Sequence, residues 1–156
     1  MQVSIKSQII DAIAQRLTKI TTANGYALDV KKVLYDKIPM GIQLNVYQLP
    51  VIFLLDGPDS IEFEHSCVKG NWDFRLQLWH NNTVGDFTML DFVRAVFKVI
   101  FADSPTAQRN DAFRALDNNI VEFIPLSISP DLNMIDANRV TEISFQIRYR
   151  TKLFDM

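Results

Sequence analysis

The sequence predicts an α+β fold, in which a largely antiparallel sheet of five or six strands carries two main helices on one face. Two segments, 3–20 and 86–102, repeat apolar residues with the period of about 3.6 that helices show. Several other segments alternate apolar and polar residues, as half-buried strands do. The elements follow in the order helix, strands, helix, strands, which is typical of α+β proteins.

The totals predict one domain spanning residues 1–156. With 156 residues, 48% of them hydrophobic and 22% charged, the chain is long enough to bury a core without disulfides or metal. Its single cysteine, Cys67, excludes an internal disulfide. A net charge of -2 argues against a general nucleic-acid binder, which relies on Lys and Arg. Charges interrupt every apolar run before the ~18 residues of a membrane span, so no membrane partner is expected.

The two predicted helices differ in how much of their surface is apolar. Residues 3–20 have one apolar face and end near Asn24-Gly25, where glycine suits a helix C-terminus. Residues 86–102 are apolar nearly all round, and Thr88 with Asp91 resembles a capping box. Such a helix is buried on several sides. Besides the sheet it needs a second neighbour, which is either the first helix or another subunit.

The central strands are predicted from three patterns. After a first strand at 27–35, the run Val51 to Leu55 is continuously apolar, as in a strand buried on both faces. Asp56 to Asp59 (DGPD) has the composition of a turn. The segments 60–67 and 72–80 then alternate, and Lys69-Gly70-Asn71 between them predicts a hairpin turn there.

The remaining segments are an edge strand at 120–128, a long alternating strand at 141–151 and three connections. Pro125 places the first strand at an edge or a bulge. Residues 36–50 alternate apolar side chains with breakers, which fits either an exposed arm or an edge strand folded over the core. Residues 129–138 read as a loop, and 106–119 as a polar segment with a weak helical pattern.

The search for chemistry finds no enzyme, cofactor or metal site. His65, Cys67 and His80 are too far apart along a hairpin to share one zinc ion, since its ligands lie at ~2 Å. His65 and Cys67 on one strand face are ~7 Å apart, which is too far for a nucleophile and its base. Arg75, Arg148 and Arg150 suit carboxylates across a sheet or interface better than phosphate. What remains is an excess of apolar surface, which indicates assembly.

The order of parts resembles a known family. The resemblance rests on the Asn24-Gly25-Tyr26 helix end, the buried strand Pro50 to Leu55, the charged hairpin, the second helix, and the segments Leu126 to Leu132 and Phe145 to Thr151. Together they resemble the tail terminator (tail completion, or tail-to-head joining) proteins of long-tailed bacteriophages. The segment 106–119 is longer and more polar than the family pattern.

This resemblance implies a structural virion protein without catalytic residues, located in the virion and assembled in the host cytoplasm. It implies a ring, usually six-fold, that caps the tail tube, ends its polymerisation and joins a head-tail connector, while DNA passes through the lumen without specific binding. The expected partners are other copies of the chain, the tail tube protein and the neck protein. The candidate interface residues are Ile38, Met40, Ile42, Leu44, Arg75, Leu132, Met134, Arg148 and Arg150. The alternatives are another neck connector or tail-tube ring protein, a small enzyme with an unrecognised site, and, less favoured, a binder of apolar ligands.

Overall fold

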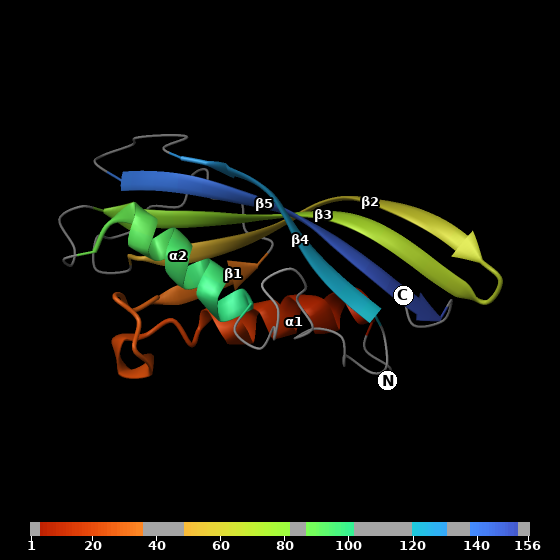
Figure 1. The fold of residues 1–156 in the computed structure, drawn as a ribbon, viewed down its shortest axis with the longest axis horizontal. Coiled ribbons are helices and arrows are strands. Elements are labelled where there is room, and N and C mark those ends of the chain that lie inside the picture. The colour runs from red at the N-terminus through yellow and green to blue at the C-terminus, as the bar shows by residue number, and fades with distance from the viewer. Residues whose placement is uncertain (1–3, 36–48, 82–86, 102–119, 131–137, 153–156) are drawn as a thin grey trace.

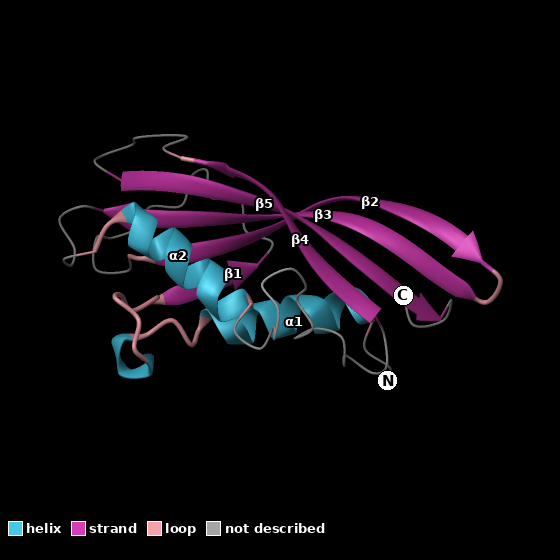
Figure 2. Ribbon diagram, in the orientation of Figure 1, coloured by secondary structure: helices cyan, strands magenta, loops and turns pink. Residues whose placement is uncertain are grey.

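The computed structural model describes residues 4–35, 49–81, 87–101, 120–130 and 138–152. Their elements are α1 (Ile5–Leu17), a short 3-10 helix η1 (Thr22–Asn24), β1 (Lys32–Tyr35), β2 (Val51–Glu64), β3 (Cys67–Asn81), α2 (Met89–Ile100), β4 (Ile120–Ser129) and β5 (Asn138–Lys152). The strands form one sheet in the order β1-β2-β3-β5-β4. Figures 1 and 2 show a long twisted sheet with both helices on the same side of it.

The predicted fold class was wrong about the sheet, which is mixed. β1 pairs with β2 in parallel, with Lys32 opposite Val51 and Tyr35 opposite Leu54, while the other three strand pairs are antiparallel. A parallel pair needs a crossover connection of a dozen or more residues, and residues 36–50 provide that length. The fold is therefore α+β with a mixed sheet in which strand exceeds helix.

The two helices and the sheet share one apolar core. From α1 it takes Ile5, Ile9, Ile13 and Leu17, which recur at helical spacing and are fully buried. These pack with Phe92 and Val96 of α2 and with the inner side chains of β2, β3 and β5. Arg16 donates a hydrogen bond of 2.8 Å to the carbonyl of Ile100, which ties α1 to the C-terminal end of α2. The second neighbour of α2 is therefore α1 of the same chain.

Two local predictions are confirmed. Thr88 and Asp91 form the predicted capping box at the start of α2, each side chain accepting from the other's backbone N–H. The run Val51 to Leu54 is buried on both faces of the sheet. Ile52 and Leu54 face the helices, whereas Val51 and Phe53 join Leu49 in a second cluster, with Leu34 and Trp79 against it.

Two predicted turns were wrong. The segment Asp56 to Asp59 is a register shift inside one continuous strand, so β2 runs to Glu64. The hairpin turns at His65-Ser66, where Glu64 pairs with Cys67, and Gly70 lies inside β3. His65 takes φ 56°, which lets a two-residue connection close the hairpin.

Candidate assembly interface

The sheet is much longer than the helices that cover it. At ~3.3 Å per residue in a strand and ~1.5 Å in a helix, the 15 residues of β3 span about 50 Å and the 13 residues of α1 about 20 Å. The β2–β3 hairpin therefore projects past the N-terminal end of α1 (Figure 1). We call residues 60–71 the hairpin extension.

A polar contact fixes the sheet where the extension begins. Lys6 of α1 forms an ion pair of 2.7 Å with Asp59 of β2, and its ammonium group lies 5.1 Å from the centre of the Trp72 ring. Tyr149 of β5 donates a hydrogen bond of 2.5 Å to the same carboxylate. Burial and the neighbouring Asp59 both raise the pKa of the Tyr149 phenol. One carboxylate thus joins a helix and two strands.

Beyond this contact the extension exposes apolar side chains. Because of the register shift at Asp56/Asp59, the residues that face the helix side change from even to odd numbers along β2. Ile61 and Phe63 consequently continue the core face, opposite Gly70 and Val68. They are 39% and 71% exposed. A buried face therefore runs on into an exposed one.

The outer strand β4 carries a second exposed apolar pair. Leu126 is 57% exposed and Ile128 is 48% exposed, and both lie beside a register shift between Pro125 and Ser127. β4 stands at the edge of the sheet opposite to β1. The two exposed pairs thus lie on different strands, on opposite sides of the β3–β5 centre.

The face of the sheet away from the helices, here the open face, is largely polar over β3 and β5. Glu142 accepts a hydrogen bond of 3.0 Å from Gln77 and lies 3.7 Å from Arg75. Nearer the extension, Lys69 and Glu64 form an ion pair of 2.6 Å. The hydrogen bond from Lys69 is the main cause that lowers the pKa of Glu64, and the charge of Arg150 adds to it. The Lys69–Glu64 pair is exposed enough for water to screen it, whereas the Glu142 side chain is only 16% exposed.

The three candidate arginines share this face but do not form one group. Arg148 and Arg150 are exposed neighbours on β5, opposite Asn71 and Lys69. Arg75 lies four positions further along β3, about 13 Å away, where it meets Glu142. Among the described residues, no carboxylate lies within 4.0 Å of the guanidinium of Arg148 or Arg150.

The other candidate residues lie outside the described part of the chain. They are Ile38, Met40, Ile42, Leu44, Leu132 and Met134, which fall within residues 36–48 and 131–137. Their predicted contribution to an interface stays a prediction. Sequence reasoning missed the exposed residues Ile61, Phe63, Leu126 and Ile128. Alternation shows which side chains share a face, but it does not show how far the strands extend beyond the helices.

The two histidines lie at opposite ends of β3. His65 lies in the hairpin turn next to Cys67, whereas His80 lies near the opposite end of β3 and is fully buried. Within the described residues no group of three His, Cys, Asp or Glu side chains is placed to hold a metal ion. In the same residues, no helix is both long enough and apolar enough to cross a membrane.

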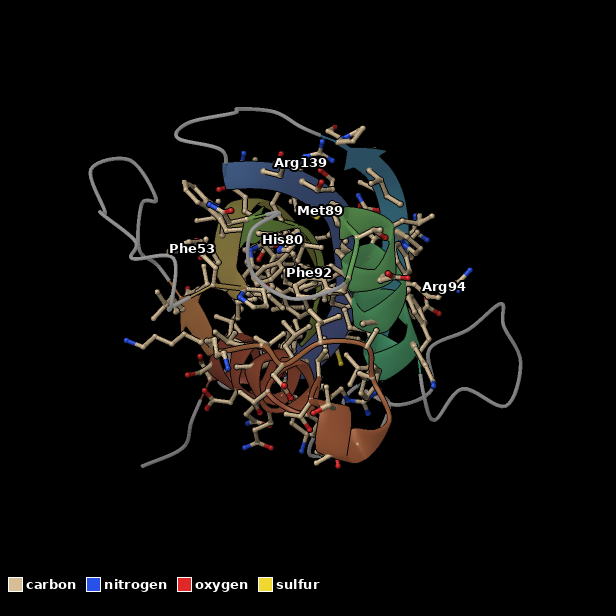
Figure 3. All side chains as sticks on the ribbon, turned by 90° about the vertical axis from the view of Figure 1, so that its left-hand side faces the viewer. Phe53, His80, Met89, Phe92, Arg94 and Arg139 are labelled. Carbon is tan, nitrogen blue, oxygen red and sulfur yellow. The ribbon has the colours of Figure 1, made fainter. Side chains whose placement is uncertain are left out.

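His80 belongs to a buried polar corner beneath the start of α2. Its ring lies against that of Phe87, with centroids 4.2 Å apart and planes tilted by 32°, and its cross-strand partner is Arg139. Figure 3 shows His80 and Phe92 directed into the interior and Arg94 directed outward from α2. Burial is the main cause that lowers the pKa of His80, and the charge of Arg139 lowers it further. The backbone of Phe87 opposes this shift, although it makes no regular hydrogen bond to the ring.

Comparison with known proteins finds a similar fold but no family that matches in sequence. No protein-family model matches the chain, and no curated protein matches it in sequence. Among solved structures, the chain resembles one described as "Virion of native gene transfer agent (GTA) particle" with a TM-score of 0.51. The likeness covers 90% of this chain and 93% of the other at 16% identity. At that identity it shows a shared fold.

Proposed function

We propose that this chain is a structural protein of a phage-like virion, with no catalytic activity. The observation that carries the proposal is the fold shared over nearly the full length of both chains with a component of a gene transfer agent virion. The surface supports it as well. In the described residues the notable features are exposed apolar side chains at sheet edges and an open polar face, and these suit contact with other proteins.

More specifically, we propose the tail-terminator role that the sequence resemblance implies. Copies of the chain would form a ring, six-fold by that resemblance, on the last ring of the tail tube. The ring would end tube growth and present its other side to the neck protein. Such a ring is built head to tail, so each copy must carry two unlike surfaces that fit each other. The two edges of the sheet differ, because β1 and β2 lie at one edge and β4 lies at the other.

The charge of the chain supports a lumen through which DNA passes without binding. The net charge is -2, and the arginines of the open face are accompanied by Glu62, Glu64 and Glu142. A wall with mixed charges of both signs does not provide the continuous row of cations that holds phosphates.

Assembly of the purified chain tests the proposal. We expect native mass spectrometry to show a closed oligomer of fixed copy number, and electron microscopy to show rings. A species that stays monomeric at every concentration would contradict a ring protein. Added to tail tubes of the same virus, the chain should stop elongation and bind only at tube ends. Incorporation along the tube would instead identify a tube protein, and attachment only to head particles a neck connector.

A further inference from the structure

Two stretches of strand edge in this sheet have no described strand beside them. β1 pairs only with Val51 to Leu54 of β2, so the edge of β2 from Leu55 to Glu64 has no strand beside it among the described residues. β4 pairs with β5 on one side, and its outer side has no described strand beside it either. Unpaired backbone N–H and C=O groups at such edges are ready to pair with another chain.

Exposed apolar side chains concentrate on these same two edges. Ile61 and Phe63 belong to the free part of β2, and Leu126 and Ile128 belong to β4. These are four of the six large apolar side chains that are exposed among the described residues. Ile61 and Phe63 lie on the helix side of the sheet, and Ile128 lies opposite the inward-facing Ile143. Along the strands Ile128 lies level with Leu54 of β2 and not with Ile61, so the two apolar pairs do not meet each other. Each edge can still bury its own apolar pair against a neighbouring copy.

The charges of the two sides are complementary. β2 carries Asp56, Asp59, Glu62 and Glu64 and no Lys or Arg. β4 itself carries one acid, Glu122, opposite Arg148. β5, directly behind β4, carries Arg139, Arg148, Arg150 and Lys152 against the single acid Glu142, so this side of the sheet is basic in sum. Opposite charges on the two ends of one sheet attract unlike edges and repel like ones.

Strand direction also permits the contact. β2 is antiparallel to β3, β3 to β5, and β5 to β4, so β2 and β4 run in opposite directions. When a second copy is placed beside the first by rotation about an axis roughly along the strands, its β4 lies antiparallel to β2. Alternation then continues from copy to copy, and each contact joins unlike edges, which is the condition for a closed ring.

We infer that neighbouring copies join through these edges, with β4 of one copy adding to the free edge of β2 of the next. In this contact Glu62 and Glu64 of one copy face the Arg148 and Arg150 side of its neighbour across β4. The inference rests on the proposed ring function and names the surface that closes the ring. The partner is a second copy of this chain, because both complementary edges lie on the same molecule.

Charge reversal tests this contact. In variant A, Glu62→Arg and Glu64→Arg make the hairpin end of the β2 edge basic; in variant B, Arg148→Glu and Arg150→Glu make the facing part of the opposite side acidic. Either variant alone places like charges at every contact, and we expect its self-association to weaken by about a hundredfold or more. A mixture of equal parts restores opposite charges at every contact. It should form rings in which A and B alternate, with masses that native mass spectrometry distinguishes from rings of one variant.

The controls separate this inference from the proposed function. Asp11→Lys and Lys19→Glu change exposed charges on and just after α1, away from both edges, and should leave assembly unchanged. Circular dichroism and urea denaturation check that A and B are folded. If the wild-type chain forms no ring, the proposed function fails. If it forms rings and A and B form them equally well alone, the edge contact is wrong while the ring function stands.

Discussion

Tyr149 of β5 lies across Gly70 of β3, so its ring occupies the space where any other residue at position 70 would carry a Cβ. The two residues are cross-strand partners, and the phenol continues past Gly70 to the carboxylate of Asp59 on β2. A glycine inside a strand often marks such a close approach. The ring of Tyr149 thus spans three strands where the hairpin extension begins, beside the backbone pairing of β3 with β5.

Replacing Gly70 with alanine should destabilise the protein, because the new methyl group overlaps the Tyr149 ring, which its hydrogen bond to Asp59 holds in place. Overpacking of this kind costs about 1–3 kcal/mol of unfolding free energy. Urea denaturation measures the loss. In the double variant Gly70→Ala with Tyr149→Ala the overlap is gone, so the effect of Gly70→Ala should become much smaller. Equal effects in both backgrounds would contradict the packing argument.

The hydrogen bond of Tyr149 should appear as a loss of stability in alkali. An unfolded phenol ionises near pH ~10, and the pKa of Tyr149 is raised in the folded protein by burial and by Asp59. Ionisation therefore favours unfolding, so this contribution is complete below pH ~10 and declines as the pH rises above it. Tyr149→Phe should lower stability at pH 7 by about 1 kcal/mol and flatten the alkaline decline.

Thermal unfolding from pH 8 to 11 measures that difference. Tyr35→Phe serves as the matched control, since Tyr35 also donates to a carboxylate, that of Asp56, but is more exposed. The slope above pH 10 should be unchanged by Tyr35→Phe. An alkaline slope that is the same in Tyr149→Phe and the wild type would show that another group causes the decline.

Local signals in the sequence located elements well where the cause was local. The capping box at Thr88 and Asp91 involves residues three apart, and the alternation along β5 directly reports which side chains face the core. The same alternation puts Arg148 and Arg150 together on the outward face. Their role toward another copy stays a prediction, because alternation says nothing of what covers a face.

The predictions of turns and strand direction failed where the local structure depends on residues far away in the sequence. Gly70 looks like a turn residue, but glycine is needed there because the ring of Tyr149 on another strand occupies the space of a side chain. Asp56 to Asp59 has turn composition, yet Asp59 is held by Lys6 and Tyr149, and Tyr35 bonds to Asp56, so the strand continues through a bulge. A strand as short as β1 carries no sign of its direction, which hid the parallel pairing.

Replacing the turn residue His65 with glycine should stabilise the protein. Its φ of 56° lies in the left-handed region, where a Cβ costs roughly 1 kcal/mol and glycine has no such penalty. His65→Gly should raise the free energy of unfolding by about 0.5 kcal/mol, after the greater entropy of glycine in the unfolded chain is subtracted. Ser66→Gly next to it, where φ is not positive, should lower stability. Guanidinium denaturation compares the two, and a destabilised His65→Gly would refute the strain.

His80 should make the protein less stable in mild acid. Its pKa is lowered in the folded state, mainly by burial and further by Arg139, whereas an unfolded histidine titrates near ~6.5. The unfolded chain therefore binds the proton more readily, so stability is complete above pH ~6.5 and falls as the pH drops below it. In His80→Phe, which keeps an aromatic ring against Phe87, this part of the decline should disappear.

The measurement for His80 is the midpoint of urea unfolding between pH 5 and 8 in three proteins. Carboxylates also take up protons near the acid end, so the difference between wild type and His80→Phe isolates the buried ring. His65→Gln is the matched control, since His65 is exposed in the turn and its substitution should leave the slope unchanged. A wild-type slope equal to that of His80→Phe would mean that protonation of His80 does not oppose folding. A smaller slope in His80→Phe would show that the corner beneath α2 holds a neutral imidazole, because a second cation beside Arg139 lacks the water it needs.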